Sequence, residues 1–329
     1  MTERHQRDRT FDIMKGIGIL LVIICHFWGW NHPLLSRTIN SFHMPMFFIV
    51  AGYFSKSYSG CEEAWTSIKK YFKRLCIPLL FTQFLIAAWA TLMAMTEGGG
   101  WDPAIREGLS LVWADPHGPL TPWGQLSIGV IWFLGALFIA KTLLLLVISR
   151  QGAWGFIVVF TLAVSALLLH KMFPYSIWCI SLGLVALPFV TLGWWLRSHT
   201  LPLWTKLLAI GCWILAIGVS YLGMYDFEWK IYPLDVVGAC GGTYVLYLLS
   251  KLIDRHLKYV SKGLAYLGII SLAIMCMHGF EIASHMGNHV KALLGINLSL
   301  DGLGVWRLLL TLAMAIVLVH IPKVKYLFS

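Results

Sequence analysis

Runs of about twenty consecutive apolar residues recur along this 329-residue chain, and they constrain its fold more than any other feature. The hydrocarbon core of a bilayer is about 30 Å thick, and a helix crosses it with about 20 residues. Charged residues make up 12% of the chain, about half of the roughly 25% usual in soluble domains. The sequence therefore predicts an all-α, polytopic transmembrane helical bundle. It excludes a soluble enzyme, a disordered chain and a secreted disulfide scaffold.

Ten apolar segments are candidates for membrane-spanning helices. They are predicted over residues 12–30, 40–56, 70–95, 127–148, 153–170, 176–196, 204–222, 232–252, 264–285 and 303–321. No internal repeat is evident, so we expect one integral membrane domain over residues 1–329.

The distribution of charge predicts the orientation of these spans. The net charge of +10 would suggest a nucleic-acid partner in a soluble protein, but a membrane protein carries such an excess in its loops. If the N-terminus is cytoplasmic, 19 Lys and Arg residues fall in cytoplasmic segments and 6 fall outside. Cytoplasmic loops of membrane proteins are enriched in Lys and Arg. We therefore expect both termini in the cytoplasm and no nucleic-acid partner.

The first predicted span carries ionisable side chains, which are costly inside a bilayer and each need a reason. Lys15 and His26 are eleven residues apart, so they share one helix face and lie about 16 Å apart along its axis. We interpret Lys15 as close to the cytoplasmic surface and His26 as near mid-depth, with Asp12 pairing with Lys15. Gly16 and Gly18 would let another backbone or a ligand approach. The structural alternatives are an interhelical hydrogen bond for His26 and a snorkelling anchor for Lys15.

The inner end of the third predicted span concentrates positive charge. Lys69, Lys70, Lys73 and Arg74 crowd one stretch of helix, and Pro78 follows where it can kink the chain. Such a cluster suits a polyphosphate ligand such as coenzyme A or a nucleotide. The alternatives are the general excess of cytoplasmic cations and contact with anionic lipid.

The ninth predicted span carries three polar residues at helical spacing. His278, Glu281 and His285 follow i, i+3, i+7 and would share one face, either as a polar network near the outer leaflet or as metal ligands. Three candidates on one helix are few for a metal, and no HExxH or Cys/His zinc pattern occurs in the sequence. We expect no metal site.

The longest predicted outer loop, over about residues 96–126, mixes aromatic, acidic and other polar residues. Aromatic and acidic side chains together can stack on and hydrogen-bond sugars, although an interfacial aromatic belt explains them as well. The residues are Trp101, Asp102, Trp113, Asp115, Pro116, His117 and Trp123.

Read in order, these motifs resemble the acyltransferase 3 family of integral membrane acyltransferases, whose ten-helix count also agrees. The family's D-x-x-[RK]-G and later His are matched by Asp12, Lys15, Gly16 and His26, and its H-x-P-x-F-F-x-x-[SA]-G by His43, Pro45, Phe47, Phe48, Ala51 and Gly52. Its R-x-x-R is matched best by Lys70 and Lys73 with Arg74 beside them, and its WFL by Trp132, Phe133 and Leu134. Its S-x-x-x-Y-x-x-H is matched by Ser271 and His278, with Met275 in place of the Tyr. Lys in place of Arg keeps the charge and loses the bidentate fork.

The resemblance implies an acyl-CoA-dependent O-acyltransferase in a bacterial cytoplasmic membrane. It would move an acyl group, expected to be acetyl, to a hydroxyl of a sugar, polysaccharide or lipid-linked glycan. His26 would act as the general base, either in direct transfer or through an acyl-His intermediate. Lys15, Lys70, Lys73 and Arg74 would hold the phosphates of the donor, which is the only co-substrate expected.

Other residues have supporting roles in this hypothesis. Asp12 would orient Lys15, whereas His43, His278 and Glu281 would lie on the acceptor side. The expected partners are the bilayer, acyl-CoA and a glycan or other hydroxyl acceptor. A glycan or lipid transporter with the same fold is the main alternative, although neither an inverted repeat nor paired broken helices can be seen in the sequence. A lipid-binding scaffold protein is the other.

Overall fold

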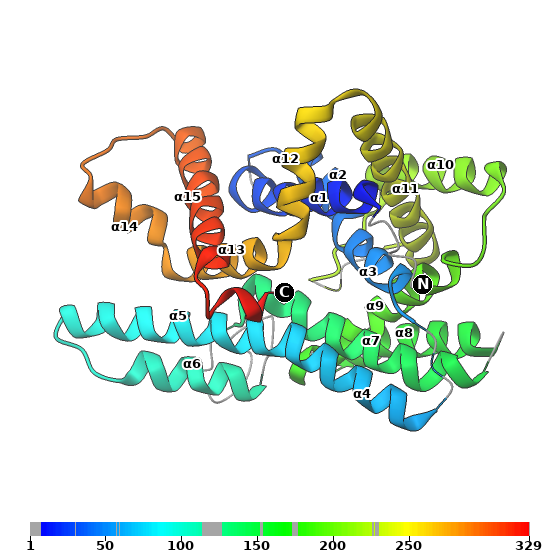
Figure 1. Cartoon of the computed structure of the whole chain (residues 1–329), viewed down its shortest axis with the longest axis horizontal. Helices are drawn as coiled ribbons and strands as arrows, with labels where there is room; N and C mark the ends of the chain where they lie inside the picture. Colours follow the sequence, from blue (N-terminus) through cyan, green and yellow to red (C-terminus); the bar gives the residue numbers. More distant parts are fainter. Residues whose placement is uncertain are drawn as a thin grey trace. The chain divides into compact units, whose positions relative to one another are not determined.

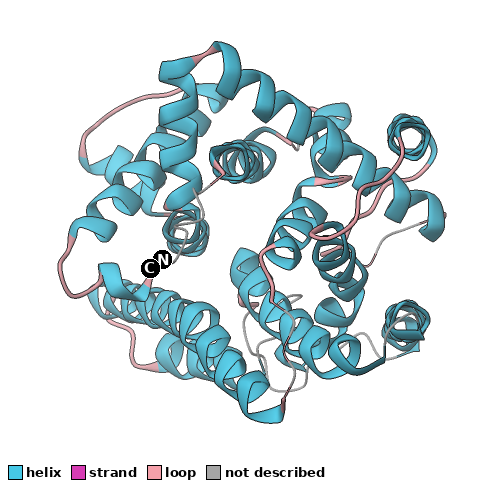
Figure 2. Cartoon of the chain, turned by 45° about the vertical axis from the view of Figure 1, so that its right-hand side comes forward, coloured by secondary structure: helices cyan, strands magenta, loops and turns pink. Residues whose placement is uncertain are grey.

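Helices make up most of the described structure of this chain. The computed structural model describes residues 8–29, 31–56, 58, 60–113, 127–151, 154–172, 177–225, 227 and 230–328. Within these ranges no β-strand forms, and helices alternate with short connections (Figure 2). The prediction of an all-α chain is confirmed for these residues.

Figure 1 shows the helices in chain order, coloured from the N-terminus to the C-terminus. They are α1 (Arg9–Trp28), α2 (Pro33–Asn40), α3 (His43–Tyr53), α4 (Cys61–Tyr71), the π-helical η1 (Phe72–Cys76), α5 (Ile77–Thr96), α6 (Asp102–Trp113), the 3-10 turn η2 (Gly129–Ile131), α7 (Trp132–Gln151), α8 (Trp154–Met172), η3 (Ile177–Cys179), α9 (Ile180–Leu196), α10 (Leu203–Val219), α11 (Tyr232–His256), α12 (Lys258–Ile269), α13 (Ser271–Ser284), α14 (Met286–Leu293), α15 (Leu300–His320) and η4 (Lys325–Leu327).

Each of the ten predicted spans contains helix, but their lengths differ. Among the described residues, six helices are long and apolar enough to cross a membrane, and they cover α1, α4 to α5, η2 to α7, α8, α11 and α15. The pair α12 and α13 passes the same test together and is bent by 68°. The apolar helices α9 and α10 are shorter, and α3 has 11 residues. The chain is therefore an integral membrane protein, while the count of ten spans and their orientation stay predictions.

Contacts between helices group the chain into two compact units, each built from segments far apart in the sequence. The first unit comprises Met1–Phe47, Leu201–Leu222 and Trp229–Ile274, and the second comprises Phe48–Thr200, Gly223–Glu228 and Met275–Ser329. In the first unit α1 packs along α12 and α11, and α10 packs along α11. In the second unit α9 packs against α7 and α8, and α5 pairs with α6.

Glycines allow α1 and α12 to touch through their backbones. A Cβ atom at Gly16 would overlap the carbonyl oxygen of Leu264, and one at Gly268 would overlap the carbonyl oxygen of Asp12. Small residues permit this approach in membrane proteins because van der Waals packing replaces the hydrophobic drive between helices. The expectation that Gly16 admits another backbone is confirmed. Gly18 instead admits side chains from the start of α3.

A single π-helical turn joins α4 to α5 just before the predicted kink at Pro78. The backbone N–H of Ile77 donates to the carbonyl of Phe72, five residues earlier. Proline has no N–H, and in an α-helix its ring would press against the carbonyl of Arg74, four residues back. The wider turn relieves this crowding, and it places Lys73 and Arg74 on a segment of the kind often found at functional sites.

The hairpin of α5 and α6 encloses a polar cluster in the second unit. The Gln83 amide nitrogen donates to a carboxylate oxygen of Glu107, which also accepts from the Ser110 hydroxyl at 3.3 Å. Burial raises the pKa of the Glu107 carboxyl above its usual value, against the lowering effect of these hydrogen bonds. The Gln83 amide oxygen is buried and has no partner among the described residues. The helix α6 was not predicted, because residues 96–126 were interpreted only as a loop.

Candidate functional site

An ion pair marks the beginning of α1. Lys15 Nζ lies 2.8 Å from Asp12 Oδ1, and the Asp12 side chain is only 6% exposed. Asp12 lies in the first turn of the helix, where a negative charge is favourable. The expected pairing of these residues is confirmed. It occurs at the Gly16–Gly268 contact, which holds this part of α1 against α12.

His26 lies at the other end of the same helix. It occupies the last turn of α1, two residues before Trp28, and its side chain is exposed. The depth of His26 in the bilayer stays a prediction, and α1 ends within two residues of the predicted span. The backbone N–H of Gly29 closes the helix on the Cys25 carbonyl at 2.9 Å, and Pro33 then begins α2. His26 is therefore accessible at a helix end.

His43 joins His26 in the first unit. It is the first residue of α3 and is 6% exposed. Its Nδ1 lies 2.8 Å from the carbonyl oxygen of Ile39. A carbonyl can only accept, so in neutral His43 the proton is on Nδ1 and Nε2 is an acceptor. The two histidines of the first two motifs thus lie in the same compact unit.

A polar cluster that the sequence did not single out lies next to His26 along α1. The Cys25 thiol donates to Asn40 Oδ1 at 3.4 Å, and the Asn40 amide nitrogen donates to Ser36 Oγ at 3.1 Å. Ser36 and Asn40 lie one turn apart on α2, a short helix whose polar residues looked like a loop. Their four-residue spacing was the signal that could have revealed it.

The basic residues of the third predicted span lie in the second unit. Lys69 and Lys70 end α4, Lys73 and Arg74 belong to η1, and all four side chains are exposed. In the described parts of the chain none of them forms an ion pair with a carboxylate. They are available to an anionic ligand. Lys15 belongs to the first unit, so its joint action with them stays a prediction.

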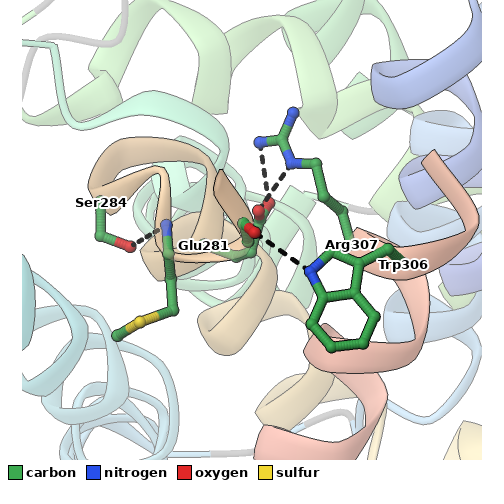
Figure 3. A network of polar contacts seen from close by, with 6 residues as sticks. Glu281, Ser284, Trp306 and Arg307 are labelled. Atoms are coloured by element: carbon green, nitrogen blue, oxygen red, sulfur yellow. Dashed lines mark hydrogen bonds and ion pairs between the residues drawn. The ribbon is translucent and has the colours of Figure 1, made fainter. Parts of the chain in front are cut away.

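The polar residues of the ninth predicted span are arranged differently from the prediction. Both carboxylate oxygens of Glu281 accept from Arg307, with Nε–Oε1 at 2.6 Å and Nη2–Oε2 at 2.9 Å (Figure 3). Glu281 and His278 are fully buried on α13. His285 does not share their face, because α13 ends at Ser284 and His285 has a φ of 50°. The predicted i, i+3, i+7 face was therefore wrong at its third position.

Hydrogen bonds from two tryptophans hold the turn between α13 and α14. Trp89 Nε1 of α5 donates to the Ser284 carbonyl at 3.2 Å. Trp306 Nε1 of α15 donates to the Gly287 carbonyl at 3.0 Å (Figure 3). Together with the Glu281–Arg307 pair, they tie α5, α13, α14 and α15 into one network within the second unit. The sequence showed no local signal for these pairings.

The proposed sugar-binding loop is only partly described. Trp101 is exposed just before α6, Asp102 begins that helix and Trp113 ends it. Asp115, Pro116, His117 and Trp123 lie outside the described residues. In the described ranges, no three His, Cys, Asp or Glu side chains gather in a way that could hold a metal ion.

Comparison with known proteins places the chain in a family. A family model described as an acyltransferase domain matches residues 8–321, a range that runs through both units. The chain belongs to the acyltransferase 3 family. The resemblance inferred from the motifs is thereby confirmed, and the protein is an acyltransferase family member with membrane-spanning helices.

Two curated relatives share part of their length with this acyltransferase. It is 26% identical over 228 residues to Nodulation protein NolL of Sinorhizobium fredii, a match that covers 64% of this chain and 56% of that protein. It is 28% identical over 162 residues to Nodulation protein NolL of Mesorhizobium japonicum, covering 46% of this chain and 39% of that protein. The chain thus spans about half the length, or less, of these relatives. No solved structure matches it.

Proposed function

We propose that this protein transfers an acyl group, expected to be acetyl, from cytoplasmic acyl-CoA to a hydroxyl of a sugar, polysaccharide or lipid-linked glycan of the cell envelope. The observation that carries the proposal is the accessible His26 in the last turn of α1, a helix whose other end holds the Asp12–Lys15 pair. The family match supports the reaction class. The excess of cytoplasmic cations supports a bacterial cytoplasmic membrane with both termini inside.

His26 has the chemistry that this transfer requires. A neutral imidazole accepts a proton near pH 7, so His26 would remove the proton of the acceptor hydroxyl while its oxygen attacks the thioester carbonyl. The new C–O bond forms and the C–S bond breaks, and the protonated His26 returns the proton to the departing CoA thiolate. An acyl-His26 intermediate would give the same products in two steps. His43, whose ring is fixed by the Ile39 carbonyl, would adjoin the acceptor.

The acyl-CoA donor would bind at the basic residues through its phosphates. Lys70, Lys73 and Arg74 would bind its phosphates, with Lys15 as a further cation held in position by Asp12. Lys15 and His26 are eleven residues apart, or about 16 Å along a helix. The extended pantetheine arm would cover this distance and present the thioester to His26. On the acceptor side, His278 and Glu281 stay predicted residues. The Glu281 carboxylate already accepts two hydrogen bonds from Arg307.

Replacement of the base tests the proposal directly. Membranes containing His26→Ala are incubated with labelled acetyl-CoA, and label is measured in the glycan fraction. We expect transfer to be abolished while the thermal unfolding of the purified variant is unchanged. His32→Ala is the matched control, because His32 is exposed close by and its side chain makes no capping hydrogen bond. Full activity of His26→Ala would remove the proposal.

Donor binding is tested separately. Charge reversal at Lys70 and Lys73 should weaken acyl-CoA binding measured by calorimetry, because phosphate binding depends on charge-assisted contacts. Unchanged binding would exclude these lysines from the donor site.

A further inference from the structure

Lys141 is a cation of α7 that the motifs did not identify. Its Nζ lies 3.3 Å from the carbonyl oxygen of Ala51 and 4.4 Å from the centroid of the Tyr71 ring. Its side chain is half-buried within an apolar helix. The ammonium carries three N–H donors, so after the carbonyl and the ring at least one donor has no partner in the described structure.

Packing between α7 and η1 positions this lysine. Phe138, one turn before Lys141, packs edge-to-face on Phe72 of η1 with ring centroids 5.9 Å apart. Residues three apart lie on the same side of a helix, so Lys141 also faces the junction of α4 and η1. Lys141 contacts the ring of Tyr71, which directly follows Lys70 in α4 and comes three residues before Arg74 in η1. Three cations, from α4, η1 and α7, therefore lie in one region of the second unit.

The described residues supply no full negative charge to neutralise these three cations. Among the described residues, no carboxylate lies within ion-pair distance of Lys141, Lys70 or Arg74. The carbonyl of Ala51 belongs to the last turn of α3, where a helix dipole supplies only about half a negative charge. Arg197 donates to the nearby Ser55 carbonyl at 3.0 Å and adds another positive charge at that end. An anion would remove the repulsion.

We propose that Lys141, Lys70 and Arg74 form one phosphate-binding site, in which Lys141 is held in place before the ligand arrives. The occupant is a phosphate group of the acyl donor, an identification that rests on the proposed function. The site adds to the basic residues expected from the sequence a lysine about seventy positions away. An anionic lipid headgroup presents the same phosphate chemistry and is the other possible source.

Calorimetry on the full chain in detergent tests the site. Lys141→Gln keeps a donor for the Ala51 carbonyl and removes the charge, whereas Lys141→Arg keeps the charge. Lys206→Gln is the matched control, because Lys206 makes a similar contact with the Tyr244 ring at 5.5 Å outside this cluster. We expect Lys141→Gln to weaken CoA binding about tenfold, Lys141→Arg to restore most of it, and Lys206→Gln to leave it unchanged.

The role of the phosphate is tested with donors that differ in it. Lys141→Gln should raise the KM for acetyl-CoA without lowering kcat to a similar extent, and it should leave the KM for S-acetylpantetheine, which has no such phosphate, unchanged. A merely structural lysine would impair both donors equally, which would overturn the proposal. Wild-type CoA affinity in Lys141→Gln would overturn it as well.

Two further outcomes separate the possible failures. If Lys141→Gln loses binding to phosphatidylglycerol vesicles but keeps its affinity for CoA, the occupant is lipid and the donor assignment is wrong. If the wild type binds CoA through Lys141 but transfers no acyl group, the proposed function fails and the phosphate site stands. If transfer occurs and Lys141→Gln has a normal KM, the site fails and the function stands.

Discussion

The Glu281–Arg307 pair gives the sharpest energetic prediction. Glu281 is 0% exposed, and two hydrogen bonds of 2.6 and 2.9 Å join it to Arg307, which is 19% exposed. Removing one partner of a buried pair costs about 3–5 kcal/mol, because a charge is left uncompensated. Neutral interhelical hydrogen bonds in membrane proteins average only about 0.6 kcal/mol. Since both groups here are ionised and the contact is bidentate, we expect Arg307→Leu to lose about 3 kcal/mol or more.

Reversible unfolding in detergent micelles measures this loss. The set comprises the wild type, Arg307→Leu, Glu281→Leu, and the double variant that carries both changes. Replacing a whole buried pair by apolar side chains is often neutral or stabilising. We therefore expect the double variant to lie closer to the wild type than Arg307→Leu does, which gives a large coupling energy. A loss below about 1 kcal/mol for Arg307→Leu, or additive single effects, would refute this reasoning.

Three further predictions concern packing, pH dependence and the α13–α14 turn. Gly16→Val should lower the stability of the fold by about 1–3 kcal/mol, because the larger side chain overpacks the α1–α12 contact. Gly263→Ala on α12, where a Cβ meets open space, should raise it by up to about 1 kcal/mol. Equal shifts in the melting temperatures of the two variants would contradict this prediction. The raised pKa of Glu107 means that the folded state binds its proton more tightly, so stability falls as pH rises from the unfolded value through the folded one. Glu107→Gln should flatten this dependence of the melting temperature on pH. It should also raise the stability of the fold by about 1 kcal/mol at neutral pH, because the new amide can donate to the Gln83 amide oxygen. An unchanged slope of melting temperature against pH would contradict this prediction. Trp306→Phe, which removes a 3.0 Å hydrogen bond, should cost about 1 kcal/mol in the same unfolding assay, and no loss would show that the bond contributes nothing.

The predicted features that hold best are those with local physical causes. The apolar runs became helices because a bilayer leaves backbone groups no other partners. Asp12 and Lys15 pair because three residues span one helix turn. A prediction from a local pattern failed where a helix ended. The positive φ of His285, just after the end of α13, removed this residue from the face of Glu281.

Other residues of the candidate site had no local signature at all. Lys141 and Arg307 belong to none of the sequence motifs. Their partners, Tyr71 of α4 and Glu281 of α13, lie 70 and 26 residues away. Only tertiary packing, such as that of α7 on α4, brings each pair into contact.

The sequence by itself determined that this protein is a helical membrane acyltransferase family member, and it identified Lys15, His26 and the basic run ending at Arg74. Hydropathy, helix periodicity and motif order carry that information along the chain. The tertiary structure alone decided that Lys141 contacts the Ala51 carbonyl and the Tyr71 ring, and that Arg307 pairs with Glu281. These contacts depend on which helices pack together, and no periodicity within one helix records its neighbours.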